Sequence, residues 1–190
     1  MSGDGDKIKS ALDIAMEKAD RLGSLSSEEK QRLEEEELAA AGEALARRCL
    51  GGLPLGDVEA ELAGRGEEHR ATITRHLLAG LAAAVDITQA GGADKALAAI
   101  ERFSGDGEAV QGIRALFGEY LAAVDRAGHG NLDALAEAKK RELESKGISG
   151  SAVKPATETS PEWLRMKEGL EAEYQGRLAE IKARWTSGSP

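Results

Sequence analysis

The stretch EEHRATITRHLL, residues 67–78, holds two of the three histidines and is the part of the sequence closest to a chemical site. On an α-helix, His69 and His76 are almost two full turns apart, so they point the same way but lie about 10 Å apart along the axis. Two ligands on one helix that share a metal ion are three or four residues apart. Thr72 and Ile73 occupy those positions and are not metal ligands. A metal site here would need carboxylates from a neighbouring helix.

Two interpretations of this histidine pair are open. In the favoured one, both histidines flank an apolar stripe that packs into a helical core. In the alternative, a helical bundle holds a small-molecule or metal site near His69 and His76. The stripe consists of Ile73, Leu77 and Leu81.

The rest of the chain offers little that could perform catalysis. The single cysteine, Cys49, ends another apolar stripe, and we interpret it as a small buried hydrophobic residue. No serine or cysteine is arranged with a histidine in the manner of a nucleophilic centre. We therefore predict a protein that is not an enzyme, with no catalytic residue, no cofactor and no metal ligand.

The elements that would position these residues are helices. Apolar residues recur at spacings of three and four, and no segment shows the alternation of a β-strand. Ser26 with Glu29 forms a capping-box pattern, and Asp106 and Asn131 are further candidate N-caps. The predicted class is all-α, an irregular multi-helix bundle. The first apolar stripe consists of Ile8, Leu12, Ala15, Ala19 and Leu22. Glycines are expected to end the helices near residues 23, 51–52, 64–66, 91–92, 105, 128–130 and 147.

A change of composition divides the chain. Residues 1–147 form the predicted helical body, and residues 148–160 are small and polar and are interpreted as a flexible linker. Pro161 then starts a separate amphipathic helix over 161–186, followed by a short tail at 187–190.

The C-terminal helix carries a continuous apolar stripe with spacings of 3, 4, 4, 4, 3 and 4. An aromatic stripe on a tethered helix is typical of a docking element, so we predict that it binds another protein or a second copy of the chain. The alternative is that the helix folds back and completes the core of its own body. The predicted partner-binding residues are Trp163, Met166, Leu170, Tyr174, Leu178, Ile181 and Trp185.

Charge and hydropathy exclude two classes of partner. The chain of 190 residues has a formal net charge of -9, which argues against binding to nucleic acid or to an anionic membrane surface. The most apolar run, residues 77–87, is too short to span a bilayer, and the N-terminus lacks the apolar segment of a signal peptide. We therefore expect a cytoplasmic location.

The segments KSALDIAMEKADRLGSLSSEEKQRL and AAAGEALARRCLGGLPL resemble the start of an uncharacterised bacterial family, a domain of unknown function. The resemblance covers about the first third of the chain. It implies a bacterial cytoplasmic protein and supplies no activity, cofactor or site residue. The function predicted from the sequence is that of a non-enzymatic helical interaction or scaffold protein.

Overall fold

The computed structural model describes residues 26–148 and 161–186, and within residues 129–135 it describes the backbone alone. The predicted stripe at residues 8–22, the break near Gly23, residues 149–160 of the linker and the tail at 187–190 lie outside the described residues. The regular elements of the described chain are all helical, which confirms the all-α class. They are α2 (Ser27–Leu50), α3 (Leu55–Ala63), α4 (Glu67–Ala83), the 3₁₀ helix η1 (Ile87–Gly92), α5 (Asp94–Ser104), α6 (Gly107–Ser145) and α7 (Pro161–Thr186).

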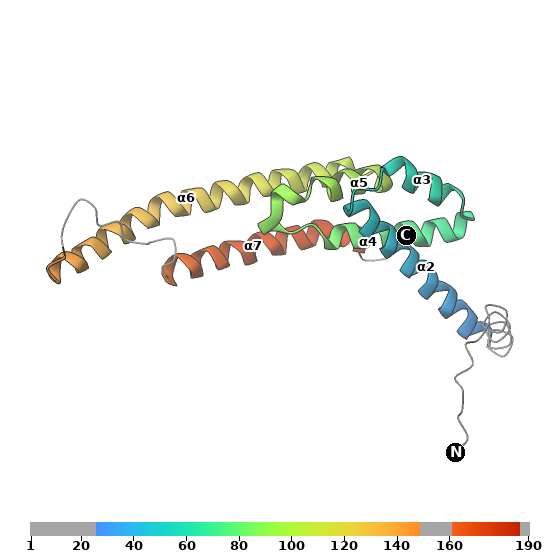
Figure 1. Ribbon diagram of the computed structural model, residues 1–190, viewed down its shortest axis with the longest axis horizontal. Helices are drawn as coiled ribbons and strands as arrows, with labels where there is room; N and C mark the ends of the chain where they lie inside the picture. The colour runs from blue at the N-terminus through green and yellow to red at the C-terminus, as the bar shows by residue number, and fades with distance from the viewer. Residues whose placement is uncertain (1–25, 149–160, 187–190) are drawn as a thin grey trace, which may run out of the picture.

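The described elements form an elongated molecule with two parts (Figure 1). Helices α2 to α5 gather at one end, around the beginning of α6 and the end of α7. The long helix α6 and the antiparallel helix α7 then run side by side away from this cluster. At 1.5 Å per residue, the 39 residues of α6 span about 58 Å. We call the part of this helix pair beyond Tyr120 and Tyr174 the arm.

Helix α2 begins with the predicted capping box. The Ser26 side chain accepts a hydrogen bond from the Glu29 amide at 3.2 Å, and the Ser26 amide donates to the Glu29 carboxylate at 2.8 Å. These contacts satisfy two backbone donors that the first turn of a helix would otherwise leave unpaired. They also hold the pKa of Glu29 below its usual value, mainly through the hydrogen bonds from Ser26.

Helices α2 and α4 run parallel and approach each other closely. Gly42 lies against Ile73 and His76, and a Cβ at Gly42 would be 2.5 Å from the Ile73 carbonyl oxygen. One turn further along, a Cβ at Gly80 would lie 2.7 Å from the Ala46 Cβ. The two helices can run parallel because α3, which lies between them in the sequence, carries the chain back toward the start of α2. The Arg48–Glu61 ion pair, at 2.8 Å, holds α3 to α2. The two glycines therefore set the distance between these helices.

The core lies where the cluster meets α6 and α7. The histidine-flanked stripe of α4 is at its centre, since Ile73, Leu77 and Leu81 are at most 1% exposed. Helix α7 contributes Leu178, which is 0% exposed. The other large side chains with almost no exposure are Val58, Val85, Ile87, Leu97, Ile100, Val110 and Ile113.

Helix α6 differs from the prediction in one respect. It begins as expected at Asp106, whose side chain accepts a hydrogen bond from the Ala109 amide at 3.0 Å. It does not end at residues 128–130, and no helix starts at Asn131, because the helical backbone continues to Ser145. Glycine within a helix costs only about 1 kcal/mol relative to alanine, so these glycines do not by themselves end the helix. The chain instead leaves the helix at Gly147, which has φ 77°.

Candidate interaction surface

The apolar side of α7 faces the rest of the molecule. Of the two alternatives left open for this helix, the structure shows the one in which α7 folds back onto the helical body. The physical reason is the area of its aromatic and aliphatic side chains, which is removed from water by contact with α6, α4 and η1. Of the seven predicted partner-binding residues, the buried ones are Trp163, Tyr174, Leu178 and Trp185, and the half-buried ones are Met166, Leu170 and Ile181.

A cluster of aromatic and charged side chains fixes the level at which α6 and α7 meet. The rings of Tyr120 and Tyr174 are 5.6 Å apart and tilted by 59°. The Arg177 guanidinium lies 4.9 Å from the Tyr174 ring and pairs with Glu119 at 2.7 Å. The Tyr120 hydroxyl donates to the Glu171 carboxylate at 3.3 Å. Burial, and then the nearby Glu171 carboxylate, raise the pKa of Tyr120.

Two further contacts fasten α7 to the end of α4. The Lys182 ammonium donates to the Val85 carbonyl oxygen at 2.8 Å, and the Ile87 amide donates to the Gln175 side-chain oxygen at 3.3 Å. Partial burial lowers the pKa of Lys182, and the Asp86 carboxylate opposes this effect. One side of α7, the side of Gln175 and Lys182, is therefore covered by η1 and the chain before it.

In the arm, the side of the α6–α7 pair that corresponds to Gln175 and Lys182 is exposed. Leu164 lies eleven residues before Gln175, which is three helical turns, so it shares the side that η1 covers nearer the cluster. Leu121 lies two turns after Arg114, whose guanidinium is 3.9 Å from the Glu101 carboxylate of α5. Leu121 is 58% exposed and Leu164 is 47% exposed. We call the side of the arm that carries these two leucines the arm face.

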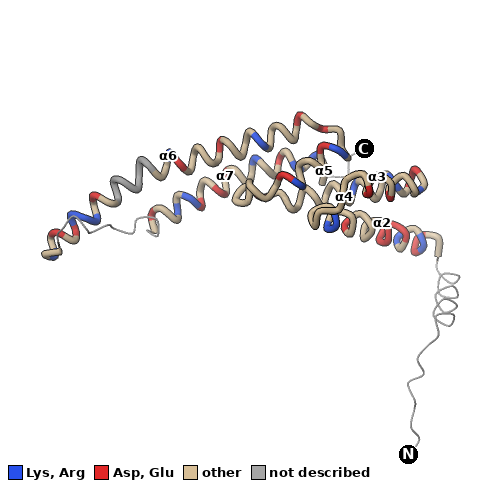
Figure 2. Tube along the Cα trace, turned by 45° about the horizontal axis from the view of Figure 1, so that its top comes forward, with Lys and Arg blue, Asp and Glu red and all other residues tan. Residues whose placement is uncertain are grey.

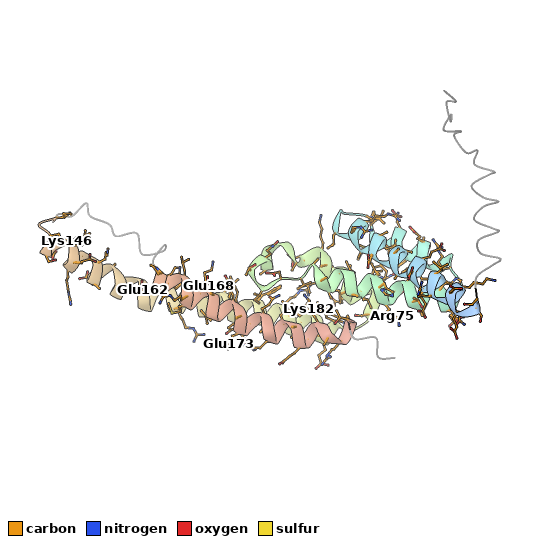
Figure 3. All side chains as sticks on the ribbon, turned by 90° about the horizontal axis from the view of Figure 1, so that it is seen from below. Arg75, Lys146, Glu162, Glu168, Glu173 and Lys182 are labelled. Atoms are coloured by element: carbon orange, nitrogen blue, oxygen red, sulfur yellow. The ribbon has the colours of Figure 1, made fainter. Side chains whose placement is uncertain are left out.

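The described part of the arm carries both kinds of charge. Acidic and basic residues are interspersed along α6 and α7 (Figure 2). Helix α6 also continues past the start of α7, so that Lys146 lies at the tip beyond Glu162 (Figure 3). At this tip, Lys139 and Lys146 pair with Glu142 at 2.7 and 2.6 Å and lower its pKa to about 2. Besides Ile148, which follows α6 and is 51% exposed, the leucines of the arm face are the large apolar side chains that depart from an ordinary charged helix surface.

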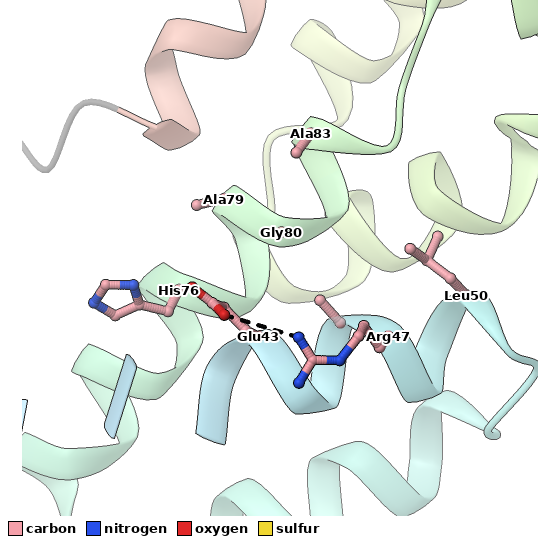
Figure 4. Close-up of a pocket in the computed structure, with 8 residues that line it drawn as sticks. Glu43, Arg47, Leu50, His76, Ala79, Gly80 and Ala83 are labelled. Carbon is pink, nitrogen blue, oxygen red and sulfur yellow. Dashed lines mark ion pairs between the residues drawn. The ribbon is translucent and has the colours of Figure 1, made fainter. Parts of the chain in front are cut away.

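The two histidines of α4 both lie against α2, but at different levels. The His69 Nε2 atom is 2.8 Å from the Glu34 carboxylate, on the exposed surface. His76 is half-buried beside Gly42 and faces a hollow that also contains Glu43 and Arg47 (Figure 4). Within the described residues, no group of three or more histidine, cysteine, aspartate or glutamate side chains is placed to hold a metal ion.

Cys49 is buried at the end of α2. Burial raises the pKa of its thiol, and nearby Arg48 opposes this only in part. A thiol with a raised pKa is a poor nucleophile at neutral pH, because the thiolate is the reactive form. The position fits the interpretation of Cys49 as a small core residue.

Comparisons with known proteins assign no family to the chain. No protein-family model, no curated protein and no solved structure matches it. No helix among the described residues is long and apolar enough to cross a membrane. The argument for function therefore depends on the surface of the molecule itself.

Sequence reasoning missed the arm face. Leu121 follows Tyr120 directly, so spacing alone does not separate the two, whereas the structure buries Tyr120 and exposes Leu121. Leu164 was visible as an apolar residue outside the α7 stripe, next to Trp163. Its position outside the stripe was the one indication of the arm face in the sequence.

Proposed function

We propose that this chain is a non-enzymatic helical interaction protein that self-associates through the arm face. The observation that carries the proposal is the exposure of Leu121 and Leu164 on the side that α5 and η1 cover closer to the cluster. In a dimer, helices of a second copy would cover the arm face in the way that α5 and η1 cover the same side closer to the cluster. Together with the second copy's side chains, these leucines would form a continuous apolar contact, and exposed apolar patches mark protein interaction sites.

The positions of the two leucines suit a symmetric dimer. Tyr120 and Tyr174 lie at the same level, so Leu164 is about 13 Å further along the arm than Leu121, at 1.5 Å per residue. A two-fold axis through the middle of the arm face would bring Leu164 of one copy to Leu121 of the other. In such an interface the contact between Leu121 and Leu164 occurs twice, once on each side of the two-fold axis.

Other features support a non-enzymatic role and a cytoplasmic bacterial location. The net charge of -9 disfavours contact with nucleic acid and anionic lipid. The buried thiol of Cys49 suits a reducing compartment, and the resemblance of the first third of the chain is to a bacterial family.

Light scattering on a sizing column tests the proposal. We expect the full chain to have the mass of a dimer, and the double variant Leu121→Glu/Leu164→Glu to have that of a monomer with unchanged helical circular dichroism. The matched control is Ala172→Glu/Ala179→Glu, which places the same charges on exposed positions of α7 that carry no leucine and should remain a dimer. A monomeric wild-type chain, or a double variant that is still dimeric, would refute self-association through the arm face.

A further inference from the structure

A shallow groove runs along the parallel helices α2 and α4, and within the described part of the chain only these two helices line it. It contains two hollows of about 360 and 340 Å³. On α4 the lining residues extend from Glu68 to Ala83, which at 1.5 Å per residue is about 22 Å, or about four helical turns. We call this feature the α2–α4 groove.

The shape of the groove suits a third helix. Gly42 and Gly80 let α2 and α4 approach closely, so the groove between them is shallow. Its α4 side is a single helix face, because the lining residues there recur at spacings of four, three and four. These residues are Thr72, His76, Ala79 and Ala83. A shallow surface between two neighbouring helices accepts the convex side of a third helix.

The end of the groove near the start of both helices is acidic. Three carboxylates line this hollow, and its only basic side chain is His69, which pairs with Glu34 at 2.8 Å. Glu35 and Glu68, the other two carboxylates, form no ion pair with another described residue. Lysine or arginine side chains of a partner would therefore find two carboxylates available here.

The other end of the groove is apolar. Small side chains of Ala79 and Ala83 project from α4, and Leu50 of α2 is only partly covered (Figure 4). Glu43 and Arg47 pair with each other at 3.8 Å, so the charges at this end are balanced. Apolar side chains of a partner helix would remove the alanines and the leucine from water.

The charge of the chain favours a different protein over a second copy in this groove. The formal net charge is -9, so a second copy would be repelled from the acidic end, whereas a basic segment of another protein would be attracted to it.

We propose that the α2–α4 groove is a second interaction surface, which binds a helix of another protein. That helix carries lysine or arginine at one end and presents leucine and alanine to the groove. Its basic residues lie on Glu35 and Glu68, and its apolar side lies on Leu50, Ala79 and Ala83. The groove is formed by α2 and α4 and the arm face by α6 and α7, so this binding does not depend on self-association.

Fluorescence anisotropy with a labelled synthetic peptide tests this surface on the full chain. The probe is a helical peptide of about 18 residues, long enough for the groove, made of leucine and alanine with lysines gathered at one end. We expect saturable binding of this peptide and none of a peptide that has glutamate in place of lysine. Failure of the lysine peptide to bind the full chain, or equal binding of both peptides, would overturn the proposal.

Charge reversal locates the basic contact. The variant Glu35→Lys/Glu68→Lys should weaken binding of the lysine peptide at least about tenfold, because two attractions become repulsions. The matched control, Glu173→Lys/Glu180→Lys, changes the net charge equally on exposed positions of α7 and should alter the affinity by less than about twofold. Equal weakening by both variants would show a general charge effect and would refute binding in the groove.

A second pair of variants locates the apolar contact. Ala79→Gln/Ala83→Gln fills the apolar hollow with longer polar side chains and should weaken binding severalfold at unchanged helical circular dichroism. Ala172→Gln/Ala179→Gln makes the same change on exposed positions of α7 and should have no effect. Unchanged affinity in the first variant would contradict an apolar contact at this end.

Two controls separate the groove from the arm face. The variant Leu121→Glu/Leu164→Glu should bind the lysine peptide as the wild-type chain does, and loss of binding would show that the peptide occupies the arm face instead. Glu35→Lys/Glu68→Lys should leave the solution mass unchanged in light scattering. A changed mass would show that a second copy occupies the groove, and either result would overturn the proposal.

Discussion

Replacing Gly42 with alanine gives the most direct test of how α2 and α4 pack. An alanine Cβ at this position would lie 2.5 Å from the Ile73 carbonyl oxygen and 2.6 Å from the His76 Cβ. The carbonyl is part of the α4 backbone and cannot rotate away, so the two helices must move apart.

Two opposing effects set the expected magnitude. Alanine in place of glycine within a helix stabilises it by about 1 kcal/mol. Forcing an extra methyl group into a tight contact costs about 1–3 kcal/mol. The net expectation for Gly42→Ala is a protein that is less stable by roughly 0–2 kcal/mol.

The control is Gly176→Ala, in α7, where an added Cβ meets nothing within 4 Å. This variant should gain about 1 kcal/mol, since only the helix propensity changes. Urea unfolding followed by circular dichroism measures both variants, and the difference between them should be about 1–3 kcal/mol at an unchanged m-value. If Gly42→Ala is stabilised as much as Gly176→Ala, the close approach of the two helices is refuted.

Three further expectations concern the core and its titratable groups. Leu178→Ala should destabilise the protein by about 2–5 kcal/mol in the same unfolding assay, because Leu178 is 0% exposed and its loss leaves a cavity; an effect below 1 kcal/mol would show that α7 is not part of the core. The raised pKa of Tyr120 means that the folded state keeps its proton where the unfolded chain loses it, so this contribution is complete below the unfolded pKa and is lost as pH rises through the folded one. Stability should therefore fall more steeply in alkali for the wild-type protein than for Tyr120→Phe, as thermal melts over that range would reveal. Cys49 should react with an aromatic disulfide reagent only as the protein unfolds, and rapid reaction of the native protein would contradict its burial.

Local features were predictable because they depend on neighbouring residues. The capping box at Ser26 and Glu29 and the cap at Asp106 follow from short-range hydrogen bonds, and the structure contains both. The apolar side of α7 was likewise visible from its spacing. The same local reasoning placed a break at 128–130, and it failed there because glycine weakens a helix without requiring it to end.

Long-range features could not be derived from spacing alone. Nothing in the α7 stripe says whether its partner is α6 or another molecule, since both offer an apolar seam. The parallel course of α2 and α4 depends on Gly42 meeting Ile73, thirty-one positions apart in the sequence. For the candidate site, the spacing identified apolar positions, but the exposure of Leu121 depends on where α5 and η1 end.

The energetics of α7 also decide which surface is available to a partner. Releasing its apolar side for docking would expose Trp163, Tyr174, Leu178 and Trp185, four large side chains that are now buried. At about 1.5–3 kcal/mol each, this costs roughly 6–12 kcal/mol, which is comparable to the whole stability of a typical domain. A partner with a micromolar dissociation constant supplies only about 8 kcal/mol. A partner of ordinary affinity therefore gains more by binding the exposed arm face, where Leu121 and Leu164 need no rearrangement of the fold.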